Sequence, residues 1–164
     1  MVATITKIKR LSFKRVNYYT VEIEDGNNEF EDFMFRMNQI PEYKIQLGHI
    51  LQFIKEIGES HGAKSNHFKH ERGAEALPPP YYFIETEYGN YGLRLYCLRL
   101  SESVVILLNG DMKTHDYPDQ CPNCKKHFQL ANKLSKKIQE GIIEKTIAIN
   151  EKEIEIEEDF EIYL

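Results

Sequence analysis

Two short segments hold most of the residues that could perform acid–base chemistry on a phosphate. Residues 113–117 follow an apolar run and place Lys113, His115 and Tyr117 within five positions, and Arg94 lies in a neighbouring segment with alternating side chains. Cleavage of an RNA phosphodiester needs a base for the 2′-hydroxyl, an acid for the departing 5′-oxygen, and cations for the charge that develops on the phosphate. Histidine, tyrosine, lysine and arginine can supply all three without a metal.

A basic segment, residues 61–73, could contribute further contacts. It has no apolar periodicity, which predicts a polar connection between elements. Its basic side chains include Lys64, His67, Lys69, His70 and Arg72. Lysine and arginine could hold an RNA backbone, and Tyr96 or Tyr117 could stack on a base. Residue type alone favours the plainer interpretation that these are solvated side chains at strand ends, because no spacing matches a specific catalytic motif.

The pair Cys121 and Cys124, in the segment CPNCKKHF, has the spacing of one zinc knuckle. A zinc ribbon needs two knuckles, and the third cysteine lies alone in a predicted strand. His115 and His127 could complete a four-ligand site. The pair could also be small, half-buried residues of a first helical turn, or weakly redox-active thiols with a pKa lowered by the helix N-terminus. We expect no cofactor, with zinc at these four residues as the alternative.

The composition predicts one soluble domain. With 164 residues, 41% of them hydrophobic, and 9 Phe and 10 Tyr, the chain can bury a core without disulfides. The first residues alternate apolar and polar types, and the longest apolar run, residues 104–108, is too short to cross a bilayer. The 3 cysteines, an odd number, favour a reducing compartment. We therefore expect a cytoplasmic protein without a membrane span.

The net charge of −5 comes from the end of the chain. Residues 151–164 contain seven acids and one lysine, which leaves residues 1–150 with 20 Lys and Arg against 19 Asp and Glu. A neutral body does not exclude nucleic acid, because phosphate contact requires only a local basic patch. The tail alternates isoleucine with glutamate, and charged alternation of this kind protects an edge strand from aggregation.

The first half of the chain predicts strands followed by helices. Residues 2–9 and 18–24 have the alternation or the β-branched and aromatic composition of strands. After the turn at residues 25–28, apolar residues recur at helical spacing from Phe30 to Met37. A second helical pattern spans residues 47–57. Two short helices separated by a few residues predict an αα-hairpin.

The second half predicts a three-stranded meander and a helix. Residues 81–88, 91–100 and 104–108 are the predicted strands. Apolar residues then recur at helical spacing over residues 122–138, with Gly141 as the expected end of that helix. The tail predicts one or two exposed edge strands.

The order of these elements resembles the RelE/HigB/ParE-like toxin superfamily of type II toxin–antitoxin modules. The resemblance covers about residues 29–140. It rests on the helix hairpin, the connection containing HFKHE, the Arg-bearing strand NYGLRLYCL, the strand VVILLNGDMKTHDYP and the terminal helix. It implies a single α+β domain whose small antiparallel sheet is packed by an N-terminal αα-hairpin and a C-terminal helix. Residues 1–28 would be added N-terminal strands and residues 141–164 an acidic, β-like tail.

The resemblance implies a ribosome-dependent mRNA endonuclease that works without metal. By position, Arg94 would contact the scissile phosphate and Lys113 would stabilise its charge, while His115 and Tyr117 would be candidate acid and base. Lys69, His70 and Arg72 would line the other wall of the site. The implied partners are an antitoxin protein and the ribosome or mRNA, with no membrane.

Two alternatives remain open from the sequence. The chain could be a non-catalytic module of the same fold that binds protein or nucleic acid. Arg94 could also serve structure alone, by pairing with Glu85 or Glu87 across the predicted sheet.

Overall fold

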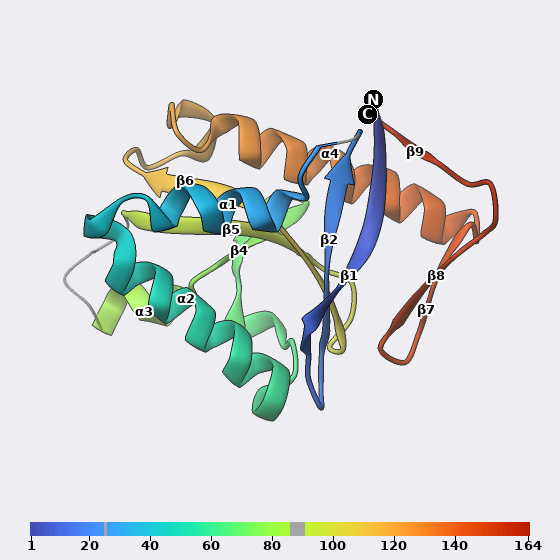
Figure 1. The fold of residues 1–164 in the computed structure, drawn as a ribbon, viewed down its shortest axis with the longest axis horizontal. Coiled ribbons are helices and arrows are strands. Elements are labelled where there is room, and N and C mark those ends of the chain that lie inside the picture. The colour runs from blue at the N-terminus through green and yellow to red at the C-terminus, as the bar shows by residue number, and fades with distance from the viewer. Residues whose placement is uncertain (25, 86–90) are drawn as a thin grey trace.

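The computed structural model of the chain describes residues 1–24, 26–85 and 91–164 (Figure 1). The described residues form an α+β fold, as the sequence predicts, with helices on both sides of a central sheet. The strands are β1 (Val2–Ser12), β2 (Asn17–Ile23), β3 (Lys69–Glu71), β4 (Ala74–Leu77), β5 (Gly92–Arg99), β6 (Val104–Lys113), β7 (Ile147–Asn150), β8 (Glu153–Ile156) and β9 (Ile162–Tyr163). The helices are α1 (Glu29–Asn38), α2 (Lys44–Glu56), α3 (Pro80–Glu85) and α4 (Lys125–Ile143). In these described ranges no helix is long and apolar enough to cross a membrane.

The central sheet has seven strands in the order β3-β4-β5-β6-β2-β1-β9 among the described residues. Neighbouring strands run antiparallel except β2 and β6, which pair in parallel. The sheet is therefore mixed, and larger than the small antiparallel sheet that the sequence predicts. β2 lies inside the sheet because it is apolar on both faces: Tyr18 and Val21 are fully buried, in opposite core layers. The N-terminal strands are thus part of the sheet rather than an appendage.

Helices cover both faces of this sheet (Figure 1). The predicted αα-hairpin, α1 and α2, packs on one face with Phe33 in its core layer, and α4 packs on the other face through Leu134. Strand β5 serves both layers, because Leu95 faces the hairpin and the neighbouring Tyr96 faces α4, as the predicted alternation requires. α4 continues to Ile143, past the glycine at which the sequence predicts its end.

Two segments fold differently from the prediction. The aromatic run 81–88 is helical where it is described, since α3 spans Pro80–Glu85, and residues 86–90 lie outside the described part of the chain. A proline at the first helical position favours this helix, because its missing N–H would have had no partner there. The connection 61–73 contains β3, which pairs with β4. These two short strands include alanine, glutamate and lysine, which are depleted in strands, so composition does not reveal them.

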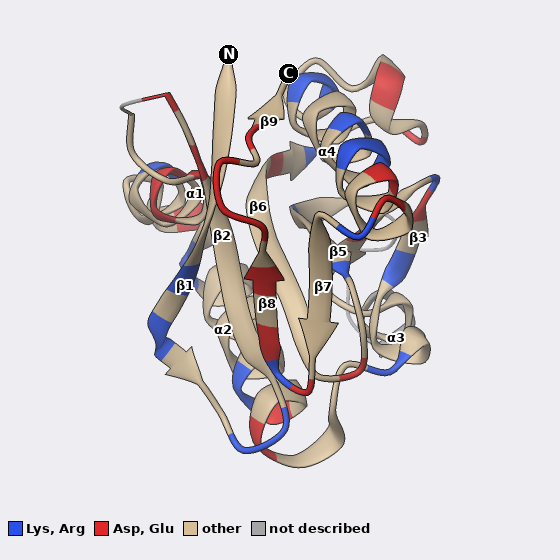
Figure 2. Cartoon of the chain, turned by 90° about the vertical axis from the view of Figure 1, so that its right-hand side faces the viewer, with Lys and Arg blue, Asp and Glu red and all other residues tan. Residues whose placement is uncertain are grey.

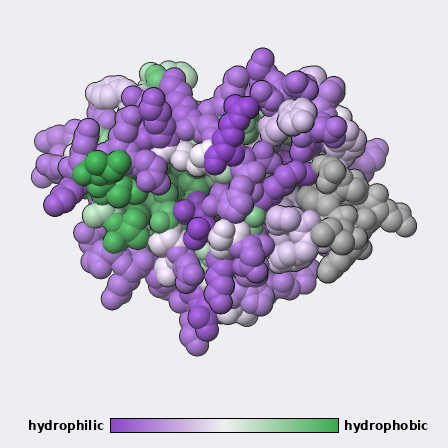
Figure 3. All heavy atoms as spheres, turned by 180° about the vertical axis from the view of Figure 1, so that it is seen from behind, coloured by the Kyte–Doolittle hydropathy of each residue, from purple (hydrophilic) through white to green (hydrophobic). Residues whose placement is uncertain are grey.

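The acidic tail is a folded part of the molecule. β7 and β8 form a separate hairpin, and β9 pairs with β1 at the sheet edge, which confirms the predicted edge strands. Glu153 on β8 accepts hydrogen bonds from Lys7 at 2.7 Å and from the Tyr19 hydroxyl at 3.1 Å, and so ties the hairpin to β1 and β2. Figure 3 shows a hydrophobic patch on the back of the molecule, at the end where Figure 1 places β7, β8 and β9.

Candidate functional site

A bulge in β6 decides which of its side chains face α4. Leu95 and Cys97 on β5 are two positions apart, but their partners on β6, Gly110 and Leu107, are three positions apart. Strand β6 therefore contains one extra residue here. The extra residue reverses the alternation of β6, so Lys113 lies opposite Gly92, on the face that carries Arg94. A Cβ on Gly110 would lie 1.7 Å from the carbonyl oxygen of Arg94. Only glycine therefore fits at this bulge.

Three cationic side chains from three strands gather on this face. Arg94 of β5 is 0% exposed and Lys113 of β6 is buried, whereas the Lys69 side chain of β3 is 29% exposed. Lys69 is close enough to Arg94 and Lys113 for both to lower its pKa, and its Nζ lies 3.9 Å from Oε1 of Glu71. Ala76 lies between Lys69 and β5 in the register, and its small side chain leaves room for longer neighbours. We call Lys69, Glu71, Arg94 and Lys113 the cationic cluster.

The cluster perturbs the ionisation of its own members. Burial, the positive charge of Arg94 and the contact with Lys113 lower the pKa of Lys69 to about 8. Burial raises the pKa of Glu71 although the neighbouring cations oppose this shift, and burial lowers the pKa of Arg94. Lys69 is therefore a lysine that can give up its proton near neutral pH. A lysine with this property can act as a general base.

The predicted acid and base lie on the exposed segment that follows β6. His115 Nδ1 is 2.9 Å from the Thr114 hydroxyl oxygen, and Tyr117 is 64% exposed. Among the described residues neither side chain has a hydrogen bond or ion pair with the cationic cluster. The structure therefore brings Arg94, Lys113 and Lys69 together but leaves His115 and Tyr117 outside their contacts.

His70 and Arg72, which were also predicted to contact RNA, have neighbours different from those of Lys69. His70 is exposed on β3, where alternation turns it away from Lys69, and its Nδ1 lies 4.0 Å from Glu75. Arg72 is exposed, 3.6 Å from Asp119 and over the ring of Phe128. Among the described residues neither has an ion pair with Lys69, although Arg72 packs on Phe128 of the helix that covers the same face.

Tyr96 cannot stack on a base in this structure. Its ring is fully buried and meets Phe128 edge to face, with ring centroids 6.1 Å apart. The reason is its place on the α4 face of β5, where the helix covers it. The alternative pairing of Arg94 with Glu85 or Glu87 involves side chains outside the described part of the chain.

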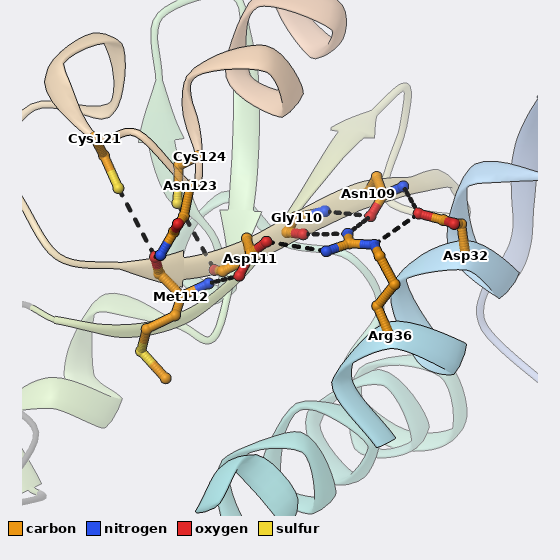
Figure 4. Close-up of polar contacts among 9 residues, drawn as sticks. All are labelled: Asp32, Arg36, Asn109, Gly110, Asp111, Met112, Cys121, Asn123 and Cys124. Carbon is orange, nitrogen blue, oxygen red and sulfur yellow. Dashed lines mark hydrogen bonds and ion pairs between the residues drawn. The ribbon is translucent and has the colours of Figure 1, made fainter. Parts of the chain in front are cut away.

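The cysteine pair joins the end of β6 to the start of α4. The Thr114 amide donates to Cys121 Sγ at 3.5 Å. Cys124 Sγ donates to the Asp111 carbonyl at 3.7 Å (Figure 4). Burial alone would raise the pKa of Cys121, but hydrogen bonds from Thr114 and Cys124 outweigh it and lower that pKa to about 6. Burial, with the nearby Cys121 sulfur, raises the pKa of Cys124 to about 12.

The zinc alternative has no assembled site in the part of the chain that the structure describes, where no three His, Cys, Asp or Glu side chains are grouped to hold a metal ion. His127 lies in the first turn of α4, beside Arg36 and Lys126, whose positive charges add to burial and lower its pKa to about 4. His115 bonds to Thr114 on the exposed segment. The thiols are fully buried, which agrees with packed residues of a helical turn.

An arginine that the sequence does not single out holds the outer edge of β6 (Figure 4). Arg36 of α1 donates to Asp32 at 2.8 Å, to the Gly110 carbonyl at 2.7 Å and to Asp111 at 2.9 Å. It also donates to the Asn109 side chain. The partners on β6 are 73 to 75 positions away in the sequence, so no local pattern could reveal them. Arg36 thereby fixes the strand at the bulge that orients Lys113.

Comparisons of this chain with protein-family models, curated proteins and solved structures give no match. Its function is therefore inferred from the arrangement of its own side chains.

Proposed function

We propose that this protein is a toxin-like endoribonuclease that cleaves RNA by metal-independent acid–base chemistry. The observation that supports the proposal is the gathering of Lys69, Arg94 and Lys113 on one face of the sheet. Cations on neighbouring strands can hold a phosphate and stabilise the charge that develops during cleavage. A lysine beside them with a pKa of about 8 can remove a proton at physiological pH.

In this proposal the general base is Lys69. It accepts the proton of the 2′-hydroxyl, the 2′-oxygen attacks phosphorus, and the bond from phosphorus to the 5′-oxygen breaks. Lys113 and the buried Arg94 stabilise the negative charge on the phosphate oxygens through their electrostatic field rather than through exposed contacts. The 5′-oxygen receives a proton from a general acid, and His115 and Tyr117 remain the candidates for that role. The products are a 2′,3′-cyclic phosphate and a 5′-hydroxyl.

A toxin of this type would have two partners, and we propose both for this protein. They are mRNA on the ribosome as the target and an antitoxin protein that keeps the enzyme inactive. Expression of the chain without an antitoxin should arrest growth, and Lys69→Ala or Lys113→Ala should relieve the arrest. Lys133→Ala, at an exposed lysine of α4, is the matched control and should remain toxic. Harmless expression of the folded wild-type protein would contradict the proposal.

Cleavage is tested directly with ribosomes, a labelled mRNA and purified protein that has been stripped of bound metal with EDTA and then desalted. We expect fragments that end in a cyclic phosphate, and we expect Lys69→Ala to yield none. Loss of cleavage by the stripped protein, restored when a transition metal is added back, would refute the metal-independent mechanism.

The second candidate is a non-catalytic module that binds RNA or protein through the same surface. The observation that favours it is the complete burial of Arg94, because a catalytic guanidinium must touch the substrate. Binding of RNA without any cleavage, in the presence of ribosomes, would decide for this candidate.

A further inference from the structure

An open cleft of about 360 Å³ lies at the end of the sheet opposite the cationic cluster. Four loops form it: the β1–β2 turn, the segment after α2, the β5–β6 turn and the β7–β8 turn. Its charged lining residues are Lys14, Arg15, His61, Lys64, Glu102 and Lys152. In Figure 2 the basic β1–β2 turn is seen at the lower end of the molecule, near the turn that joins β7 to β8.

The charge of this cleft is opposite to that of the whole chain. The cleft is lined by three lysines, one arginine, one histidine and a single carboxylate. The whole protein, by contrast, has a net charge of −5. Within the described part of the chain, none of Lys14, Arg15, Lys64 and Lys152 forms an ion pair. Cations gathered in a concave site focus the local potential and attract anions.

Hydrogen bonds between the loops hold the cleft in shape. Lys152 Nζ donates to the Phe13 carbonyl at 2.8 Å and to the Lys14 carbonyl at 3.3 Å. An ammonium group has three N–H donors, so one remains for a ligand. The Arg15 amide donates to the Gly58 carbonyl at 2.8 Å and the Ala63 amide to the Glu102 carbonyl at 2.7 Å, so the other loops are tied as well. The site is therefore largely formed before a ligand arrives.

Among the described residues, no apolar side chain lines the cleft. The lining residues are charged, histidine, serine or glycine. A protein partner would bury apolar side chains at the centre of its interface, whereas a nucleic-acid backbone presents phosphates to basic side chains. The lining thus favours phosphates over a folded protein surface.

We infer that this cleft binds the phosphate backbone of RNA at a second site, separate from the cationic cluster. A strand rises about 3.3 Å per residue, so Arg94 and the β5–β6 turn are roughly 20 Å apart along β5. One RNA chain or one folded RNA can therefore contact both ends of the sheet. The inference rests on the proposed function, because it takes RNA as the target.

The test is binding of a labelled RNA, measured by fluorescence anisotropy over a range of salt concentrations. The protein carries Lys69→Ala, so that cleavage does not interfere. The double variant Arg15→Glu/Lys64→Glu should lower the affinity at least tenfold. It should also reduce the slope of log K against log salt by roughly 1.4, because each lost phosphate contact on a single strand contributes about 0.7.

The matched control is Lys133→Glu/Lys136→Glu on α4, which changes the net charge by the same amount on exposed residues of another surface. It should weaken binding far less. Equal losses in the two double variants would overturn the inference, because they would show a response to net charge alone. Displacement of the RNA from the parent protein by polyglutamate at equal charge concentration would assign the cleft to an acidic protein segment and would also overturn it.

A parallel cleavage assay on the protein without Lys69→Ala separates the two proposals. RNA binding that depends on the cleft, without any cleavage, supports the second site and refutes the nuclease. Cleavage accompanied by binding that is indifferent to Arg15 and Lys64 supports the nuclease and refutes the second site.

Discussion

Cationic side chains cluster at both ends of strands β5 and β6, but they are buried at one end and exposed to solvent at the other. The cationic cluster is mostly buried beneath α4, and burial together with Arg94 and Lys113 lowers the pKa of Lys69. The cleft at the other end is open, and Lys14, Arg15 and Lys64 are exposed to solvent on loops that backbone hydrogen bonds hold in place. Burial makes charge repulsion strong and converts it into altered proton affinity, whereas water screens the same repulsion. The buried end is therefore suited to proton transfer and the open end to attraction.

The largest effect should come from the bulge that orients the buried end. Gly110→Ala would place a Cβ against the Arg94 carbonyl oxygen, and the backbone of β5 or β6 must move. We expect a loss of roughly 3 kcal/mol or more in the free energy of unfolding, measured by urea denaturation. The control is Gly48→Ala in α2, where an added Cβ meets nothing within 4 Å. Alanine there should stabilise the protein by about 0.5–1 kcal/mol. Tolerance of Gly110→Ala would refute the role of the bulge.

The next effect distinguishes a functional lysine from a structural one. The pKa of Lys69 falls on folding, so the charged form destabilises the fold fully below pH 8, and this penalty disappears as the pH rises from about 8 toward the unfolded value of 10.5. Lys69→Met should therefore raise the free energy of unfolding at pH 7 by on the order of 1–3 kcal/mol, and abolish cleavage.

The stability gain from Lys69→Met should shrink when the measurement is repeated at pH 10. In the wild type, cleavage should increase with pH and reach half its maximum near pH 8, as the proposed base loses its proton. Lys133→Met, at an exposed residue of α4, should alter neither property. A destabilised Lys69→Met protein would indicate that the lysine supports the fold.

The open end should behave in the opposite way. Arg15→Glu/Lys64→Glu removes two exposed cations that have no ion pair with a described residue, so the free energy of unfolding should stay within about 0.5 kcal/mol of the wild type. Thermal unfolding checks this. A large loss of stability would show that these side chains hold the loops together and would remove the contrast with the buried end.

The smallest effect concerns the hairpin that carries Lys152 into the cleft. Hydrogen bonds from Lys7 and Tyr19 lower the pKa of Glu153, so this contact contributes stability at neutral pH that is lost as the pH falls below the ordinary glutamate value of 4.5. Glu153→Gln should lower the melting temperature slightly at pH 7, and the difference from the wild type should vanish in acid. A difference that persists unchanged at low pH would exclude the carboxylate charge as its cause.

Local sequence patterns were sufficient to predict most of the strands and helices that form the two core layers. The alternation in β5 predicts which side chains face each core layer, and helical spacing predicts α1, α2 and α4. These elements could be found because each has one apolar face whose period is set by its own backbone geometry. Arg94 lies on a strand with clear apolar alternation and Lys113 follows a continuous apolar run, so both could be placed near a predicted strand, but their roles were proposed from residue type and the family resemblance.

What the sequence alone determined was therefore the α+β class, the pair of cysteines at the start of α4, and the two strands that carry Arg94 and Lys113. The tertiary structure decided which of these residues meet. The face of Lys113 depends on a bulge that only the β5–β6 register reveals, and Lys69 joins it from a segment with no periodicity of its own. The cleft likewise unites four loops that are distant in the sequence. Such contacts depend on strand register and loop packing, which no local pattern of residue types encodes.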